Sequence, residues 1–450
     1  MQKVYFSSMY SLFVIVFLNE LLVIDQGFNT IVMSGLTVIF LFSSLWLTRG
    51  FQFYISIISL ILGHFILFNY GLGLDLWHSS ITKGIGMAVL MVAIPLISFP
   101  VKHGGYLDAV ESYILKRSTK QGFLFSFLAV LHLALTVALN IGSIPTMQNL
   151  IDKIKFPKRY LAQLYTAGYS SYMVFSPYDG VVNMVLLFSG LKYSQYLFSG
   201  LVMVAAIIAV SAVILLTDKK VLEEMKVSLG SSETNQNDGK TYELLLHICL
   251  LVICASIGVN IIPFSNPLYV IAVIIIFYST VWGLMVGCLK EYKKELKTYS
   301  KNLLSYRSFL PFLISASFLG TLISYTPFKE NIGGILLSFN SLPVYLIVLI
   351  FILFAVILSL CGIHMMITVT TLALTVNPEV VGLSATAFAL TLLTCWYMAM
   401  CISPFAPFAV IVAETIGDKP VNVTFRYNVK FLVVMIFLAP AIIAAVNYLT

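Results

Sequence analysis

Apolar runs of about twenty residues recur along most of this 450-residue chain and constrain its fold more than any other feature. A helix needs about 20 apolar residues to cross the hydrocarbon core of a bilayer. A β-barrel is not expected, because its strands alternate over segments of about ten residues. Uninterrupted runs of the required length lie at 4–24, 29–48, 51–70, 82–100, 195–217, 242–262, 267–289, 307–325 and 428–449.

Composition excludes the other fold classes. Hydrophobic residues make up 60% of the chain and charged residues 10%, and the mean hydropathy is +0.97. In an average soluble protein about a quarter of the residues are charged, and disordered chains are poor in aromatic residues. The sequence therefore predicts an all-α polytopic membrane protein. Its net charge of +7 is expected to mark the cytoplasmic side of the membrane, and no nucleic-acid partner is expected.

Two further apolar stretches, 160–190 and 383–416, are long enough to cross but are interrupted near their middle. Each interruption is a Ser-Pro pair, and proline removes a backbone donor from a helix. One such proline often only kinks a membrane helix. Two at matched positions favour true breaks. The pairs are Ser176-Pro177 and Ser403-Pro404.

Two other stretches, 123–152 and 343–376, are apolar helices that reach small or polar residues and then begin a second short helical run. This pattern predicts re-entrant hairpins, which enter and leave on the same side of the membrane. The expected tips are Asn140-Ile141-Gly142-Ser143-Ile144-Pro145 and Cys361-Gly362-Ile363-His364.

The basic residues predict the orientation. With the N-terminus in the cytoplasm and both hairpins not crossing, nearly all of the 26 lysines and arginines fall on the inside. Only Lys83, Lys192 and Lys329 fall outside. The positive-inside rule then supports about eleven crossings, including a retained first span, with the C-terminus outside. We expect a multi-pass protein of the plasma (inner) membrane.

The two halves of the chain repeat the order span, hairpin, broken helix and closing span. The distance from Pro177 to Gly190 equals that from Pro404 to Gly417. An odd number of crossings separates the halves, so their orientations should be opposite. Inverted repeats with discontinuous helices are typical of secondary transporters. The polar stretch 218–241 is expected to be a cytoplasmic linker between the halves, and the basic stretch 290–306 a surface helix near lipid headgroups.

Two ionisable residues stand beside the predicted breaks. Asp179 follows the first Ser-Pro pair, and a carboxylate at that depth costs about 2.5–3.5 kcal/mol on insertion scales. It is expected either to couple ions or contact solute, or to bond to a neighbouring helix end. His364 lies at the second hairpin tip, where it either takes part in proton coupling or solute binding or is a structural group.

Helix N-termini at such breaks offer N–H groups to an anion, and freed carbonyls can hold a cation. We therefore expect a solute and ion site around the tips and breaks, with a transient Na⁺ near Asn140, Ser143 and Ser176. The remaining candidate binding residues are Gly142, Thr146, Pro177, Asn183, Gly362, Thr368, Ser403 and Pro404.

The arrangement resembles the ion transporter superfamily, and within it the divalent anion:sodium symporters of the INDY type. The likeness covers about residues 30–450 and is partial at motif level. The family places Ser-Asn-Thr at each hairpin tip, where this chain has Asn140-Ile141-Gly142-Ser143 and Cys361-Gly362-Ile363-His364. The family's Thr-Pro breaks correspond loosely to the two Ser-Pro pairs.

The resemblance implies a homodimer working as an elevator, in which scaffold parts stay fixed and transport parts move. The scaffold would comprise 1–100 and 242–325. The transport domain would comprise 101–217, with the inward hairpin, and 326–450, with the outward hairpin.

The sequence thus predicts a secondary transporter of a small anionic organic solute, coupled to H⁺ or Na⁺ and embedded in the bilayer. No enzyme motif, cofactor motif or metal-ligand spacing is present, so no catalytic residue, cofactor or resident metal is expected. The six cysteines are expected to act as small hydrophobic residues. The alternatives are a polytopic enzyme of cell-envelope assembly or a lipid-linked flippase. Short outer loops and the scarcity of Lys or Arg within spans argue against both.

Overall fold

The computed structural model covers the chain, and the description that follows concerns the placed residues. These are 2–22, 26–49, 51–110, 121–151, 155–228, 238–264, 266–288, 290–291, 294–295, 299, 304–307, 309–323, 325–326, 342–361 and 365–450.

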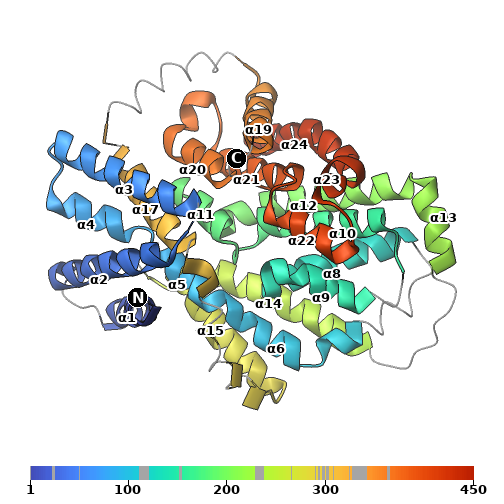
Figure 1. The fold of residues 1–450 in the computed structure, drawn as a ribbon, viewed down its shortest axis with the longest axis horizontal. Helices are drawn as coiled ribbons and strands as arrows, with labels where there is room; N and C mark the ends of the chain where they lie inside the picture. The colour runs from blue at the N-terminus through green and yellow to red at the C-terminus, as the bar shows by residue number, and fades with distance from the viewer. Residues whose placement is uncertain are drawn as a thin grey trace.

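Every secondary-structure element in this part of the chain is helical (Figure 1), as the apolar runs predict. The helices of the first half are α1 (Gln2–Leu22), α2 (Gln26–Leu47), α3 (Phe51–Asn69), α4 (Leu74–Thr82), α5 (Ile85–Ala93), η1 (Ile94–Ile97), α6 (Ser98–His103), α8 (Gln121–Leu139), η2 (Asn140–Gly142), α9 (Ser143–Ile151), α10 (Lys158–Phe175), α11 (Gly180–Phe188) and α12 (Tyr193–Leu216). Those of the second half are α13 (Lys219–Ser228), α14 (Asp238–Ile261), α15 (Pro267–Met285), η3 (Leu304–Arg307), α17 (Phe309–Ile323), α19 (Val344–Leu360), α20 (Met365–Thr375), η4 (Glu379–Val381), α21 (Ala385–Ile402), α22 (Pro407–Ile416), α23 (Pro420–Asn422), η5 (Val423–Tyr427) and α24 (Val429–Leu449).

The chain is a multi-pass membrane protein. Within the placed ranges, 7 helices are long and apolar enough to span a membrane. Shorter apolar helices, such as α19, accompany them. The helix bounds follow the sequence-predicted runs closely, with one exception. The run 82–100 is not continuous, because the 3₁₀ turn η1 separates α5 from α6 at Pro95. Proline lacks the N–H that would continue the α-helical ladder.

The stretch 123–152 does reverse direction. Ser143 Oγ lies 3.2 Å from His132 Nε2, although the two residues are eleven apart in sequence. In a continuous helix they would be roughly 16 Å apart. The reversal occurs at Asn140, which has φ of +50°, a left-handed conformation that asparagine tolerates. Helices α8 and α9 therefore form the first hairpin, as predicted.

The second predicted hairpin consists of α19 and α20, which contact each other. Its tip residues Gly362, Ile363 and His364 lie outside the placed residues.

The two broken helices have matching local geometry. Helices α10 and α21 each contain 18 residues, and each is followed by four non-helical residues before the next helix begins. Ser176 and Ser403 leave their helices in extended conformations, with ψ of 125° and 119°. Asp179 N donates to Ser176 O over 3.1 Å, and Ala406 N donates to Ser403 O over 3.2 Å. The two breaks therefore share one local backbone geometry.

Helices α10 and α21 lie at the centre of the half of the molecule that carries the breaks. Helix α10 contacts α8, α12, α21 and α22, and α21 contacts α19, α20 and α24. In Figure 1 these helices occupy the upper centre and the right, while α1 to α4 lie on the left. There α17 contacts α3, and α1 contacts α2.

Candidate functional site

A cavity of about 200 Å³ lies where the first hairpin tip, the first helix break and α21 meet. The hairpin tip, the helix break and a central helix therefore line the same cavity. Its lining residues are Ile94, Asn140, Tyr169, Met173, Tyr178, Asp179, Gly180, Val181, Trp396 and Met400.

Asn140 places the hairpin tip at this cavity. Its side-chain Oδ1 accepts hydrogen bonds from its neighbour Ile141 N at 2.6 Å and from the hydroxyl of Tyr169 at 3.2 Å. The Tyr169 ring stacks on Phe408 of α22 with ring centroids 5.2 Å apart. One tyrosine of α10 thus links the hairpin tip to the helix that follows the second break.

Asp179 is the N-cap of α11. Its Oδ1 accepts from Val181 N at 2.8 Å and from Val182 N at 3.1 Å, and the residue is 8% exposed. A carboxylate at a helix N-terminus satisfies two otherwise unpaired donors and is favoured by the helix dipole. Asp179 thus caps the helix that it begins, and the same residue borders the cavity.

The backbone carbonyls of the first break already have donors within the protein. Asn183 Nδ2 donates to Pro177 O at 2.5 Å and to Asp179 O at 2.8 Å. Two α12 tyrosines reach the last turn of α10. The hydroxyl of Tyr193 donates to Phe175 O at 2.8 Å, and that of Tyr196 to Val174 O at 2.7 Å. These bonds stabilise a helix end that lies inside the protein, where an unpaired carbonyl would be costly.

Ser143 lies behind the hairpin tip in a buried polar cluster. Its Oγ is 2.9 Å from Thr136 Oγ1 and 3.2 Å from His132 Nε2, and none of the three residues is exposed. His132 Nδ1 has no hydrogen-bond partner among the placed residues. The cluster therefore holds the two arms of the hairpin together.

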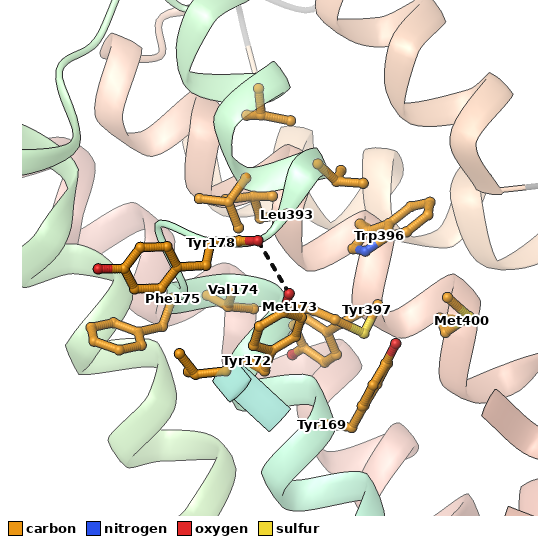
Figure 2. Close-up of a cluster of buried hydrophobic side chains, with 14 of the residues drawn as sticks. Tyr169, Tyr172, Met173, Val174, Phe175, Tyr178, Leu393, Trp396, Tyr397 and Met400 are labelled. Carbon is orange, nitrogen blue, oxygen red and sulfur yellow. Dashed lines mark hydrogen bonds between the residues drawn. The ribbon is translucent and has the colours of Figure 1, made fainter. Parts of the chain in front are cut away.

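Helix α21 forms the opposite wall. Figure 2 shows Trp396 and Met400 of α21 beside Tyr169 and Met173 of α10. The indole Nε1 of Trp396 is buried and has no hydrogen-bond partner within the placed part of the chain. A solute in the cavity can supply the acceptor that this donor lacks.

Among the placed residues that line the cavity, Asp179 alone carries a formal charge. The remaining wall is largely aromatic and sulfur-containing, with Asn140 as the neutral polar group. The cavity thus combines one carboxyl, a few hydrogen-bonding groups and extensive apolar surface, which is the usual composition of a small-molecule site.

The structure brings only part of the expected site residues into this cavity. Asn140 and Asp179 line it, while Ser176 and Pro177 belong to the break directly behind it. Ser176 Oγ accepts from Tyr178 N at 3.2 Å. Gly142 O accepts from Thr146 Oγ1 at 2.8 Å, so these two residues close the turn of the hairpin.

The second-half candidates are placed differently. Ser403 is buried and Pro404 half-buried at the second break, but neither lines the cavity. Thr368 lies in α20, buried, with no hydrogen-bond partner for its hydroxyl in the placed part of the chain. Gly362 and His364 are outside the placed residues.

Sequence reasoning missed His132, Tyr169, Tyr178 and Trp396. His132 could have been found as a polar residue on the hairpin arm facing the expected tip. The aromatic residues gave no signal, because aromatic side chains are common in membrane helices and their partners are far away in sequence.

Comparison with solved structures identifies similar folds. The chain superposes on the YdaH transporter of Alcanivorax borkumensis with a TM-score of 0.61 and 14% identity, covering 87% of this chain and 97% of that one. It superposes on MtrF of Neisseria gonorrhoeae with a TM-score of 0.58 and 12% identity, covering 91% and 98%. MtrF is described as illuminating a class of antimetabolite efflux pumps. No protein-family model and no curated protein sequence matches the chain.

At these identities the likeness shows the fold alone. The chain has the fold of polytopic membrane transporters, and both similar structures are transporters rather than enzymes. It agrees with the all-α polytopic fold expected from the sequence, while the resemblance to the ion transporter superfamily stays a prediction. The narrower resemblance to INDY-type symporters stays a prediction.

Proposed function

We propose that the chain is a secondary active transporter of a small organic solute, coupled to H⁺ or Na⁺ and using elevator-type alternating access. The observation that supports this most is the cavity of about 200 Å³ between a hairpin tip, a helix break and the second broken helix. Irregular backbone within a membrane protein is tolerated where it is buried in protein or lines a cavity, and discontinuous helices commonly form transporter binding sites.

The chemistry of the wall suggests the form of the solute. Tyr169, Tyr178 and Trp396 offer flat apolar surface, and Asn140 and the Trp396 indole offer hydrogen bonds. We propose a small organic anion with an apolar or aromatic part. The negative charge of the solute is inferred mainly from the sequence, because the placed lining residues include no cation.

The lack of a cation among the placed lining residues supports coupling of solute binding to H⁺ or Na⁺. An anion entering beside the Asp179 carboxylate would bring two negative charges together in a site of low dielectric constant, where such repulsion is strong. A proton on Asp179, or a Na⁺ beside it, offsets one charge. We therefore propose that Asp179 carries or binds the coupling cation, so that solute and cation bind together.

The moving parts are proposed from the packing. The helices around α10 and α21 contact one another extensively, which supports residues 101–217 and 326–450 as the transport domain. The contacts of α17 with α3 and of α15 with α5 support 1–100 and 242–325 as the scaffold, with 218–241 as the cytoplasmic linker. Helix α13 occupies the first part of that linker. We further propose a homodimer in the plasma (inner) membrane, with the N-terminus inside and the C-terminus outside.

The test begins with the purified chain in detergent. A thermal-shift screen of small aromatic and aliphatic acids, with and without Na⁺ and at two pH values, identifies solutes that bind the folded state. A solute that raises the unfolding midpoint is then followed in proteoliposomes under imposed proton and sodium gradients. Because MtrF is described with efflux pumps, both directions are measured. Transport that persists unchanged when both gradients are collapsed contradicts the proposal.

Asp179→Asn separates coupling from folding. Asparagine is also a good N-cap, so we expect the unfolding midpoint to change little while gradient-driven transport falls more than tenfold. Ser384→Ala is the matched control, because Ser384 caps α21 by accepting from Ala387 N at 3.1 Å and lies outside the cavity lining. It should lower stability by about 1 kcal/mol and leave coupling intact.

A further inference from the structure

A second cavity, of about 280 Å³, lies where α10 begins, beside the start of α13 and the π-helical turn η5. It is separate from the solute cavity and shares no lining residue with it. Its lining residues are Pro157, Lys158, Arg159, Asp218, Lys220, Val221, Glu224, Arg426 and Tyr427.

The lining is predominantly basic. Four cationic side chains come from three separate segments, against the carboxylates of Asp218 and Glu224. Asp218 is already paired, because Arg159 Nη1 lies 2.5 Å from its Oδ2. Arg159 Nε is buried and has no hydrogen-bond partner among the placed residues. The cavity therefore presents excess positive charge to an anion, and one of its arginines keeps an unused donor.

Contacts within the fold position part of this lining. Lys158 Nζ donates to Gly417 O at 2.5 Å, and the Arg426 guanidinium lies 5.8 Å from the centroid of the Tyr427 ring. Tyr427 is fixed in turn by donating to Asp418 Oδ2 at 2.5 Å. Contacts of Arg159 and Tyr427 thus shape the cavity, while Lys158, Lys220 and Arg426 are exposed side chains of its lining.

Exposed apolar side chains lie close in sequence to two of the lining segments. Val213 and Leu216, in the last turn of α12 just before Asp218, are exposed, and so is Phe425 of η5. On a membrane helix such side chains face lipid tails. A ligand with a charged head and an apolar tail would fit both surfaces at once.

We propose that this cavity binds the phosphate-bearing head group of an anionic phospholipid. The basic side chains contact the phosphodiester, and the acyl chains lie along the exposed residues of α12 and η5. Basic pockets at the cytoplasmic ends of membrane helices bind anionic head groups in this way. A zwitterionic head group fits less well, because its cation would meet the excess positive charge. A bound lipid would tie the start of α10 to the ends of α12 and η5.

The test uses the full chain in neutral detergent. Short-chain phosphatidylglycerol, short-chain phosphatidylcholine and inorganic phosphate are added separately, and the unfolding midpoint and lipid adducts in native mass spectra are measured. We expect phosphatidylglycerol to raise the midpoint and give a saturable adduct, and the other two to do neither. A shift with inorganic phosphate as large as that with phosphatidylglycerol would overturn the lipid assignment.

The variant Lys220→Gln with Arg426→Gln removes two cations of the lining. At about fivefold per charge, affinity for phosphatidylglycerol should fall about 25-fold. The control Lys219→Gln with Lys430→Gln removes two exposed cations of the same region outside the lining, and should retain wild-type affinity. Equal binding by all three proteins overturns the proposal. The single substitutions serve if the double variant unfolds, and none of these readouts depends on transport.

Discussion

The hydroxyl of Tyr169 donates a hydrogen bond of 3.2 Å to Asn140 Oδ1, and so joins α10 to the tip of the first hairpin. Asn140 is also where the backbone turns with φ of +50°. Because both residues line the solute cavity, this bond fixes one wall of the site. A change in hairpin position therefore moves Asn140 in the cavity wall and alters its bond to Tyr169.

Tyr169→Phe removes this bond and keeps the ring that stacks on Phe408. We expect solute affinity to fall about fivefold, corresponding to the roughly 1 kcal/mol of a typical hydrogen bond. Isothermal titration with the solute found in the thermal-shift screen measures the change. Tyr448→Phe, at a residue that is 91% exposed, is the control. Unchanged affinity in Tyr169→Phe would show that the bond does not shape the site.

Ser143→Ala removes the shared partner of Thr136 and His132 inside the first hairpin. Thr136 Oγ1 keeps its bond to His132 O, but the buried His132 Nε2 loses its partner. Such a loss costs about 1–3 kcal/mol, so we expect lower stability and faster amide exchange at residues 139–146. Hydrogen–deuterium exchange with mass spectrometry tests this. Ser171→Ala is the matched control, since Ser171 is buried and its hydroxyl donates to Ala167 O of its own helix at 2.7 Å. Equal effects of the two substitutions would contradict a role in joining the arms.

Gly168→Ala tests the close approach of α10 to α8. A Cβ at this position would lie 2.8 Å from the Cβ and Cγ of His132. Such overpacking costs about 1–3 kcal/mol, and we expect a lower unfolding midpoint and a displaced hairpin arm. Gly35→Ala in α2, where no heavy atom lies within 4 Å, should be neutral or slightly stabilising. A neutral Gly168→Ala would mean that the two helices separate at little cost.

Asp418 predicts an acid-sensitive contribution to stability. Hydrogen bonds from Tyr427, Asn422 and the Lys419 N–H lower the pKa of its carboxyl to about 2. The unfolded value is about 3.9, so the stabilisation is present above about pH 4 and is lost as the pH falls toward 2. We expect the stability difference between wild type and Asp418→Asn to shrink over this window, measured by denaturant unfolding in detergent.

Tyr427→Phe removes the largest cause of this pKa shift. It should move the acid transition toward higher pH, because the carboxyl pKa then returns toward its unfolded value. We expect Asp418→Asn to lower the free energy of unfolding less at pH 3 than at pH 5. Equal losses at the two pH values would contradict a contribution of these hydrogen bonds.

The sequence by itself determined where the helices lie and where they break. Backbone groups in lipid must be paired internally, so each apolar run has to be helical. Ser176-Pro177 and Ser403-Pro404 interrupt two of these runs, since proline removes a donor, and the structure has breaks of equal length at both places. The same rule applied to Pro95 would have located the break in 82–100.

Only the tertiary structure decided which side chains meet. The reversal at Asn140 brings His132 to Ser143, and the packing of α10 against α21 places Trp396 opposite Tyr169. Tyr193 and Tyr196 pair with carbonyls of a helix that ends about eighteen residues earlier. Hydrophobic periodicity reports burial along one segment. It carries no information about which distant segment supplies the other wall of a cavity, and that choice depends on the packing of the whole molecule.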